Sequence, residues 1–135
     1  MAGYSSAPLV KKLGMKPSDD TILVNQPDNY EQLIGLDLEK LSLVSLSSSE
    51  LADFIHLFTM EMAELEVIFP RLKQQLKKDG MLWVSWPKAT SSLPKDLNGN
   101  DVRSIGLANG LVDVKVCAVD EDWSAIKFMY RRSDR

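Results

Sequence analysis

Segments typical of strands alternate with segments typical of helices along this chain, and this alternation restricts the fold more than any other feature. Three short apolar runs have the length and composition of strands: residues 21–24, 41–46 and 81–86. Two more, 111–119 and 124–131, flank a four-residue connection, which is typical of a β-hairpin. Alternating strands and helices form parallel sheets with right-handed crossovers. We therefore expect a three-layer α/β sandwich whose sheet is mostly parallel and gains an antiparallel strand from the C-terminal hairpin.

Capping residues mark the helices between these strands. A leading helix at 7–13 ends in a glycine, Asn29 begins a short second helix, and Asn100 begins a later one. Ser47 followed three residues later by Glu50 is a capping-box pattern. It predicts a helical turn between the strand at 41–46 and the third strand, which lies within the segment 51–69 described next.

The segment 51–69 admits two interpretations. Its apolar residues recur at helical spacing, which predicts one long amphipathic helix. In the alternative, 53–58 is a buried parallel strand, Thr59 caps a helix that begins at Met60, and Pro70 kinks or restarts that helix. Periodicity alone does not choose between them.

Size and charge exclude several classes of protein. A chain of 135 residues, 44% apolar and 26% charged, fits one globular domain over residues 1–135. Its net charge of -3 repels a phosphate backbone, so we expect no nucleic-acid partner. No run of about 18 apolar residues is present, which predicts no membrane insertion. The single cysteine favours a reducing, cytoplasmic compartment.

Three segments carry a resemblance to a known family: GYSSAPLVKKLGMK near the start, DGMLWVSWPK around the strand at 81–86, and GLVDVKVCAVDEDWSAIKF in the hairpin. They resemble the bacterial family of domain of unknown function 3052, and the likeness spans nearly the whole chain. Residues 28–49 match it poorly. The resemblance implies a small stand-alone domain with a Rossmann-like, methyltransferase-like sheet and no assigned activity. It also implies a strand followed by a helix at 51–69.

The turn after the first strand bears on cofactor binding. Enzymes of this shape place a glycine-rich turn there, because glycine lets backbone amides approach the cofactor closely. Residues 25–30 contain no glycine, and neither Ser45 nor Leu46 after the second strand offers a carboxylate for ribose hydroxyls. The sequence therefore predicts no adenosylmethionine or nicotinamide cofactor.

A serine and lysine three residues apart match one catalytic motif. Ser85 and Lys88 fit the pattern S-x-x-K of penicillin-recognising enzymes, in which both residues lie on one helix. Here Ser85 lies in a predicted strand, Pro87 follows it, and the companion motifs are missing. We interpret the match as chance.

Other catalytic and metal chemistry also lacks support. His56, the only histidine, falls in a predicted central strand, which favours a buried, hydrogen-bonded role. Cys117 lies in an apolar run and behaves as a small hydrophobe, so no zinc set is present. Glu61, Glu64 and Glu66 are expected to be solvent-facing charges on a helix.

Polar and aromatic residues converge on one edge of the predicted sheet. Open parallel sheets bind ligands beyond the carboxyl ends of their strands. The ligand-binding candidates expected there are Asn25, Asp28, Thr59, Ser85, Trp86, Lys88 and Trp123. Trp83 and Trp86, three apart on a strand, point to opposite faces, so at least one of them should pack under a helix, and Trp86, at the end of the strand, is a candidate to line a pocket. Lys88 is expected to pair with the hairpin acids 120–122.

These observations favour a non-catalytic domain that binds an unknown small molecule or protein. The alternatives are an enzyme that holds a small anionic metabolite near Lys88, and an oligomeric scaffold that pairs through the final strand. The oligomeric state stays open.

Overall fold

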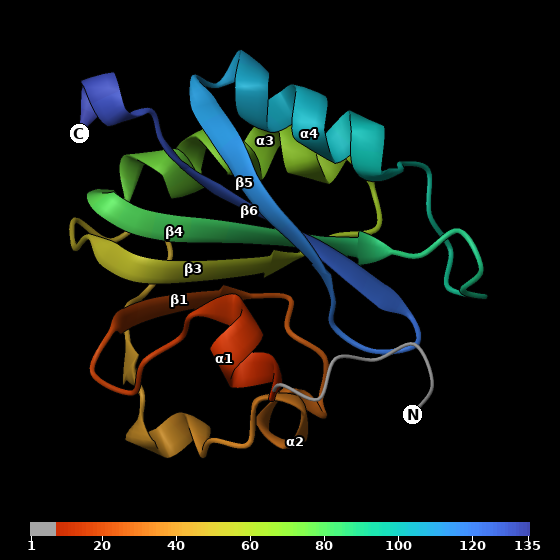
Figure 1. Cartoon of the computed structure of the whole chain (residues 1–135), viewed down its shortest axis with the longest axis horizontal. Helices are drawn as coiled ribbons and strands as arrows, with labels where there is room; N and C mark the ends of the chain where they lie inside the picture. Colours follow the sequence, from red (N-terminus) through yellow and green to blue (C-terminus); the bar gives the residue numbers. More distant parts are fainter. Residues whose placement is uncertain (1–7) are drawn as a thin grey trace.

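The computed structural model describes residues 8–135, so the first residue of the predicted leading helix lies outside the described part. Figure 1 shows one twisted sheet with helices packed on both faces. The elements in chain order are α1 (Leu9–Leu13), β1 (Asp20–Val24), α2 (Tyr30–Ile34), η1 (Leu38–Lys40), β2 (Ser42–Leu43), β3 (Ala52–Phe58), α3 (Met62–Gln74), β4 (Leu76–Pro87), α4 (Gly99–Ala108), β5 (Leu111–Ala118), β6 (Trp123–Tyr130) and η2 (Arg132–Asp134).

The sheet has six strands in the order β2-β1-β3-β4-β6-β5. β1 pairs in parallel with β2 and with β3, and β3 pairs in parallel with β4. β6 is antiparallel to both β4 and β5. The predicted architecture is therefore confirmed: a mostly parallel α/β sheet that is completed by an antiparallel C-terminal hairpin.

The segment 51–69 forms a strand and then a helix. β3 is buried on both faces. The side chains of Phe54 and His56 lie on the face of the sheet covered by α1 and α2, whereas Ile55 lies on the face covered by α3 and α4. A strand satisfies apolar residues on both sides at period two, which a half-exposed helix does not. Pro70 lies inside α3 without ending it.

The second strand is much shorter than predicted. Only Ser42–Leu43 pairs with β1, and the rest of 41–46 belongs to a loop. The buried Gln75 side chain instead bonds the backbone of residues 45–50. Its Oε1 accepts from Ser47 N at 2.6 Å, and its Nε2 donates to Ser45 O at 3.1 Å and to Glu50 O at 3.0 Å. Ser47 takes a φ of 67°, so the predicted helical turn does not form.

Two element boundaries also differ from prediction. β4 begins at Leu76, and its first residue pairs with Ala52 ahead of a register shift. α4 is capped by Asn98 instead of Asn100, because Asn98 and Asp101 form a reciprocal capping box.

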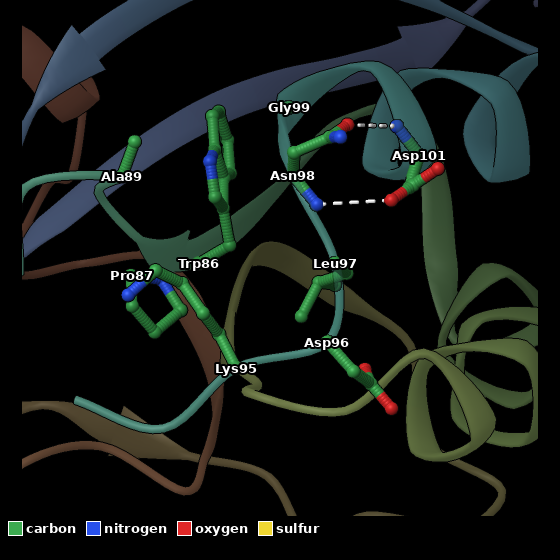
Figure 2. Close-up of a pocket in the computed structure, with 9 residues that line it drawn as sticks. All are labelled: Trp86, Pro87, Ala89, Lys95, Asp96, Leu97, Asn98, Gly99 and Asp101. Atoms are coloured by element: carbon green, nitrogen blue, oxygen red, sulfur yellow. Dashed lines mark hydrogen bonds between the residues drawn. The ribbon is translucent and has the colours of Figure 1, made fainter.

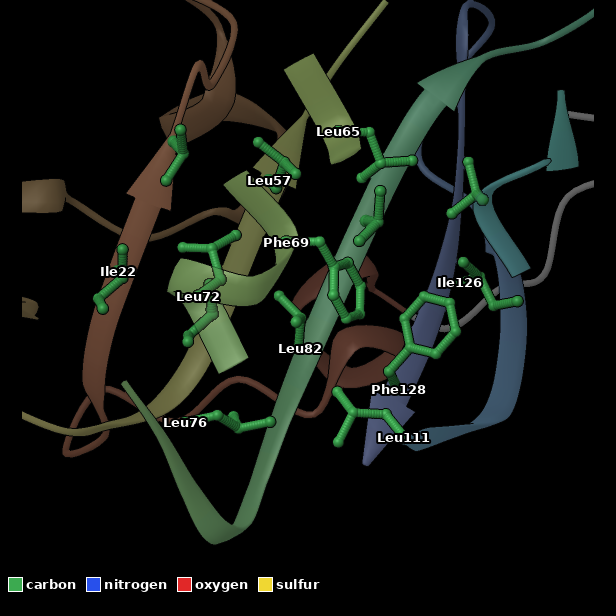
Figure 3. Close-up of a cluster of buried hydrophobic side chains, with 14 of the residues drawn as sticks. Ile22, Leu57, Leu65, Phe69, Leu72, Leu76, Leu82, Leu111, Ile126 and Phe128 are labelled. Atoms are coloured by element: carbon green, nitrogen blue, oxygen red, sulfur yellow. The ribbon is translucent and has the colours of Figure 1, made fainter. Parts of the chain in front are cut away.

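The apolar core consists of two clusters, one on each face of the sheet. The larger lies under α3 and α4, where Phe69 meets Phe128 edge to face at 5.4 Å between ring centroids (Figure 3). Gly106 in α4 lies so close to Phe128 that a β-carbon there would overlap the ring. The smaller cluster holds Trp83 under α1, where the indole N–H donates to Leu13 O at 2.8 Å, so one of the two tryptophans packs under a helix, as expected. Within residues 8–135, no helix has the length and apolar character needed to cross a bilayer.

Candidate functional site

The candidate site lies at the carboxyl ends of β1 and β3. β1 is connected through α2 to β2 on one side, and the chain then crosses to β3 on the other side, so the strand order reverses there. Such a switch point is the usual ligand crevice of open α/β sheets. A cavity of about 420 Å³ opens at this edge, and its lining is Asn25, Gln26, Phe58, Thr59, Met60, Glu61, Glu64 and Trp123.

Asn25 gives the turn after β1 its shape. Its φ of 58° is in the left-handed region, which glycine adopts freely and asparagine adopts more readily than most other residues. The side chain fixes this conformation, since Nδ2 donates to Phe58 O at 3.2 Å and to Glu64 Oε1 at 3.3 Å. The turn thus obtains a left-handed residue without a glycine.

Thr59 and Glu64 form the polar wall of the cavity. Thr59 is buried directly after β3, and its Oγ1 donates to Glu64 Oε1 at 2.8 Å. Its amide donates to Ser85 O at 3.0 Å, which ties the wall to β4. Two donors, from Asn25 and Thr59, therefore hold one carboxylate oxygen of Glu64 in place.

Trp123 and Phe58 form the aromatic wall. Their rings meet edge to face at 5.0 Å between centroids. The hairpin holds Trp123 at its tip, because Asp120 Oδ1 accepts from the Trp123 amide at 2.9 Å. The lining carries the carboxylates of Glu61 and Glu64 and no basic side chain. Carboxylates beside aromatic faces favour a cationic ligand group.

A second cavity, of about 360 Å³, lies beside Trp86 (Figure 2). Gly99 at the start of α4 lets the helix approach the indole, since a β-carbon there would lie 2.9 Å from Trp86 Cζ2. Lys95 lines this cavity, but its ammonium donates to Ser91 O at 2.8 Å and to Leu93 O at 3.0 Å. These bonds stabilise the loop that precedes α4. Trp86 therefore lines a different pocket from Trp123.

The predicted candidates are only partly brought together. Asn25, Thr59 and Trp123 share the first cavity, whereas Asp28 is exposed in the same turn outside its lining. Ser85 is buried in β4 and is not accessible to a ligand. Lys88 lines neither cavity.

The expected ion pair of Lys88 is absent among residues 8–135, where its only bond to the hairpin acids is from its backbone amide to Asp122 O at 2.8 Å. Glu64 is exposed, as expected, and it also lines the first cavity. Its position in the first turn of the helix after a buried strand is the signal that could have identified it.

His56 has the buried, hydrogen-bonded role expected from its place in a central strand. Its Nδ1 lies 2.9 Å from the Tyr30 hydroxyl and its Nε2 lies 2.7 Å from Ser85 Oγ. Phe58 stacks on the imidazole at 4.3 Å between ring centroids. Burial lowers the pKa of His56 to about 3, so the ring is neutral at physiological pH.

Comparison with known proteins identifies the fold. No family model and no curated protein matches the chain. Among solved structures, a magnesium protoporphyrin IX methyltransferase from Synechocystis PCC 6803 with bound SAH is similar, with a TM-score of 0.63, 10% identity, and coverage of 91% of this chain and 79% of that one. An S-adenosylmethionine-dependent methyltransferase from Clostridium acetobutylicum gives a TM-score of 0.58 at 8% identity, covering 90% and 87%. A fibrillarin from Methanococcus jannaschii gives 0.55 at 16% identity, covering 91% and 72%.

The chain therefore has the Rossmann-like fold of S-adenosylmethionine-dependent methyltransferases. The expectation of a non-catalytic binding or interaction domain is corrected by this finding, because similar solved structures, two of them reported above, are methyltransferases. At the turn without a glycine, Asn25 takes the left-handed conformation that glycine adopts freely.

Proposed function

We propose that the chain is a methyltransferase that binds S-adenosylmethionine in the cavity between Asn25, Glu64 and Trp123. The observation that carries this proposal is the position of an acidic, aromatic-walled cavity at the switch point of a methyltransferase fold. A volume of about 420 Å³ lies within the range of small-molecule pockets, roughly 300–1,000 Å³.

The lining suits the chemical groups of this cofactor. The sulfonium and the amino group of the methionine part are cations, which suit the Glu61 and Glu64 carboxylates and the Trp123 ring. The adenosine part would be held over the turn that begins at Asn25 and Gln26. β2 ends without a carboxylate, at Leu43, so the chain departs there from the ribose-binding pattern of Rossmann-like enzymes.

When bound, adenosylmethionine supplies a methyl group whose bond to sulfur breaks as a lone pair of the acceptor bonds to the methyl carbon, leaving a neutral thioether. The protein's own residues have two tasks. Glu64, oriented by Asn25 and Thr59, stabilises the cationic end of the cofactor. Glu61 lines the same cavity and is exposed, so its carboxylate can take the proton that the acceptor releases.

Titration calorimetry tests this proposal. We expect saturable binding of one equivalent of adenosylmethionine, weaker binding of adenosylhomocysteine, which lacks the sulfonium charge, and no binding of NAD. Glu64→Gln and Trp123→Ala should each weaken binding about tenfold or more, in line with the loss of a charged hydrogen-bonded group or an aromatic wall. Glu66→Gln is the matched control, because Glu66 is exposed on the same helix outside the cavity. Absence of binding to the unaltered chain would refute the proposal.

Three further expectations remain proposals. We propose membership in the bacterial family of domain of unknown function 3052, a cytoplasmic location, and an acceptor that is a small molecule or protein. The net charge of -3 supports an acceptor other than nucleic acid.

A further inference from the structure

We propose that the buried hydrogen-bonded chain of Tyr30, His56 and Ser85 positions the turn 25–29 for ligand binding, which makes Tyr30 and His56 positioning residues of the cavity. This inference rests on the proposed function for the identity of the ligand. The anchoring itself can be tested on the free protein.

The chain of hydrogen bonds crosses three elements that are distant in sequence. Tyr30 begins α2, His56 lies in the middle of β3, and Ser85 lies near the end of β4. All three side chains are at most 1% exposed. Because a neutral imidazole has one N–H and one lone pair, one hydroxyl donates to the ring and the other accepts from it.

The turn is fixed at both ends. At its start, the Asn25 side chain donates to Phe58 O at 3.2 Å. At its end, the Tyr30 amide donates to Pro27 O at 3.0 Å, and the Tyr30 hydroxyl reaches into the core to His56. The residues between the anchors make no backbone hydrogen bond to the described strands, so the side chains of Asn25 and Tyr30 hold the turn against the sheet.

Stability alone does not account for this arrangement. Replacing paired buried polar groups by apolar groups of the same shape is often close to neutral for folding. Apolar rings would pack against Phe54 and Phe58 in several rotations, whereas paired hydrogen bonds permit one. The hydrogen bonds of Tyr30, His56 and Ser85 therefore fix the orientation of the Tyr30 side chain, and with it the position of the end of the turn.

Tyr30→Phe tests the inference, because it removes the hydroxyl and keeps the ring. Tyr130→Phe is the matched control: the Tyr130 hydroxyl donates to Lys73 O at 3.2 Å, and Tyr130 lies at the far end of β6 from the hairpin tip that carries Trp123. Two quantities are measured for both variants and for the unaltered chain. They are the backbone order parameters of Gln26, Asp28 and Asn29 without ligand, and the Kd for adenosylmethionine.

We expect Tyr30→Phe to lower these order parameters from about 0.85 to below about 0.6. It should also weaken adenosylmethionine binding about tenfold, the usual effect of one buried hydrogen bond. Tyr130→Phe should change neither quantity, even where it lowers the Tm equally. Unchanged order parameters in Tyr30→Phe would refute the anchoring. If the unaltered chain binds no adenosylmethionine, the proposed function fails, and the order parameters still decide the anchoring.

Discussion

Acid should destabilise this protein through its single histidine. In the unfolded chain His56 titrates near its ordinary pKa of 6.5, whereas in the folded protein burial lowers that pKa to about 3. Between these values the unfolded state binds more protons, so the free energy of unfolding falls as the pH falls. This contribution is complete above the unfolded pKa and is progressively lost below it.

The magnitude follows from the difference between the two pKa values. Each pH unit below the unfolded pKa costs somewhat more than about 1 kcal/mol, so at about pH 4.5 the folded protein loses roughly 3 kcal/mol relative to neutral pH. For a domain of 135 residues, this corresponds to a fall in Tm of several degrees.

Urea unfolding of the unaltered chain and of His56→Gln, followed from neutral pH to about pH 4.5, isolates this contribution. Carboxylates such as Asp20, whose pKa is lowered by its hydrogen bonds to Ser42 and Lys77, titrate in both proteins and cancel in the difference. We expect His56→Gln to be less stable at neutral pH but to lose less stability in acid. Because the chain has one histidine, its ring signals also report the pKa directly by NMR. Equal pH dependence in both proteins, or a ring pKa near 6.5, would refute the reasoning.

Two substitutions test the backbone around the site and the core. Gly106→Ala forces a β-carbon against the buried Phe128 ring, so urea unfolding should show a loss of about 1–3 kcal/mol, part of which Phe128→Leu restores by making room. Asn25→Ala should destabilise the protein by about 1–2 kcal/mol through the left-handed backbone and the lost hydrogen bonds, whereas Asn25→Gly should cost less, because glycine adopts a φ of 58° freely. If Ala and Gly at position 25 have equal stability in the same assay, the backbone argument is wrong.

Local patterns predicted the layout of the sheet but not all of its details. The hairpin was evident because two strand-like runs flank a short polar connection, and the structure confirms it. The segment 51–69 stayed ambiguous because a strand buried on both faces has no polar alternation to distinguish it from a helix. The second strand was overpredicted, since the Gln75 side chain, far away in sequence, satisfies the backbone of 45–50.

The site was harder to predict than the fold. Placing Asn25 and Thr59 at one edge required only the strand ends, and the structure brings both to one cavity. Glu64 was missed because an exposed glutamate on a helix has no pattern that marks a bound carboxylate. The conformation of the turn was also hidden, because a sequence does not show that Asn25 adopts a left-handed conformation supported by Phe58 O.

The most direct test of the central claim is a map of amide and indole chemical shifts as adenosylmethionine is added to the labelled protein. The account predicts the largest changes in the turn 25–30, at Thr59 and Glu64, and at the indole N–H of Trp123. Changes confined to the second cavity around Trp86, or no changes at all, would contradict it.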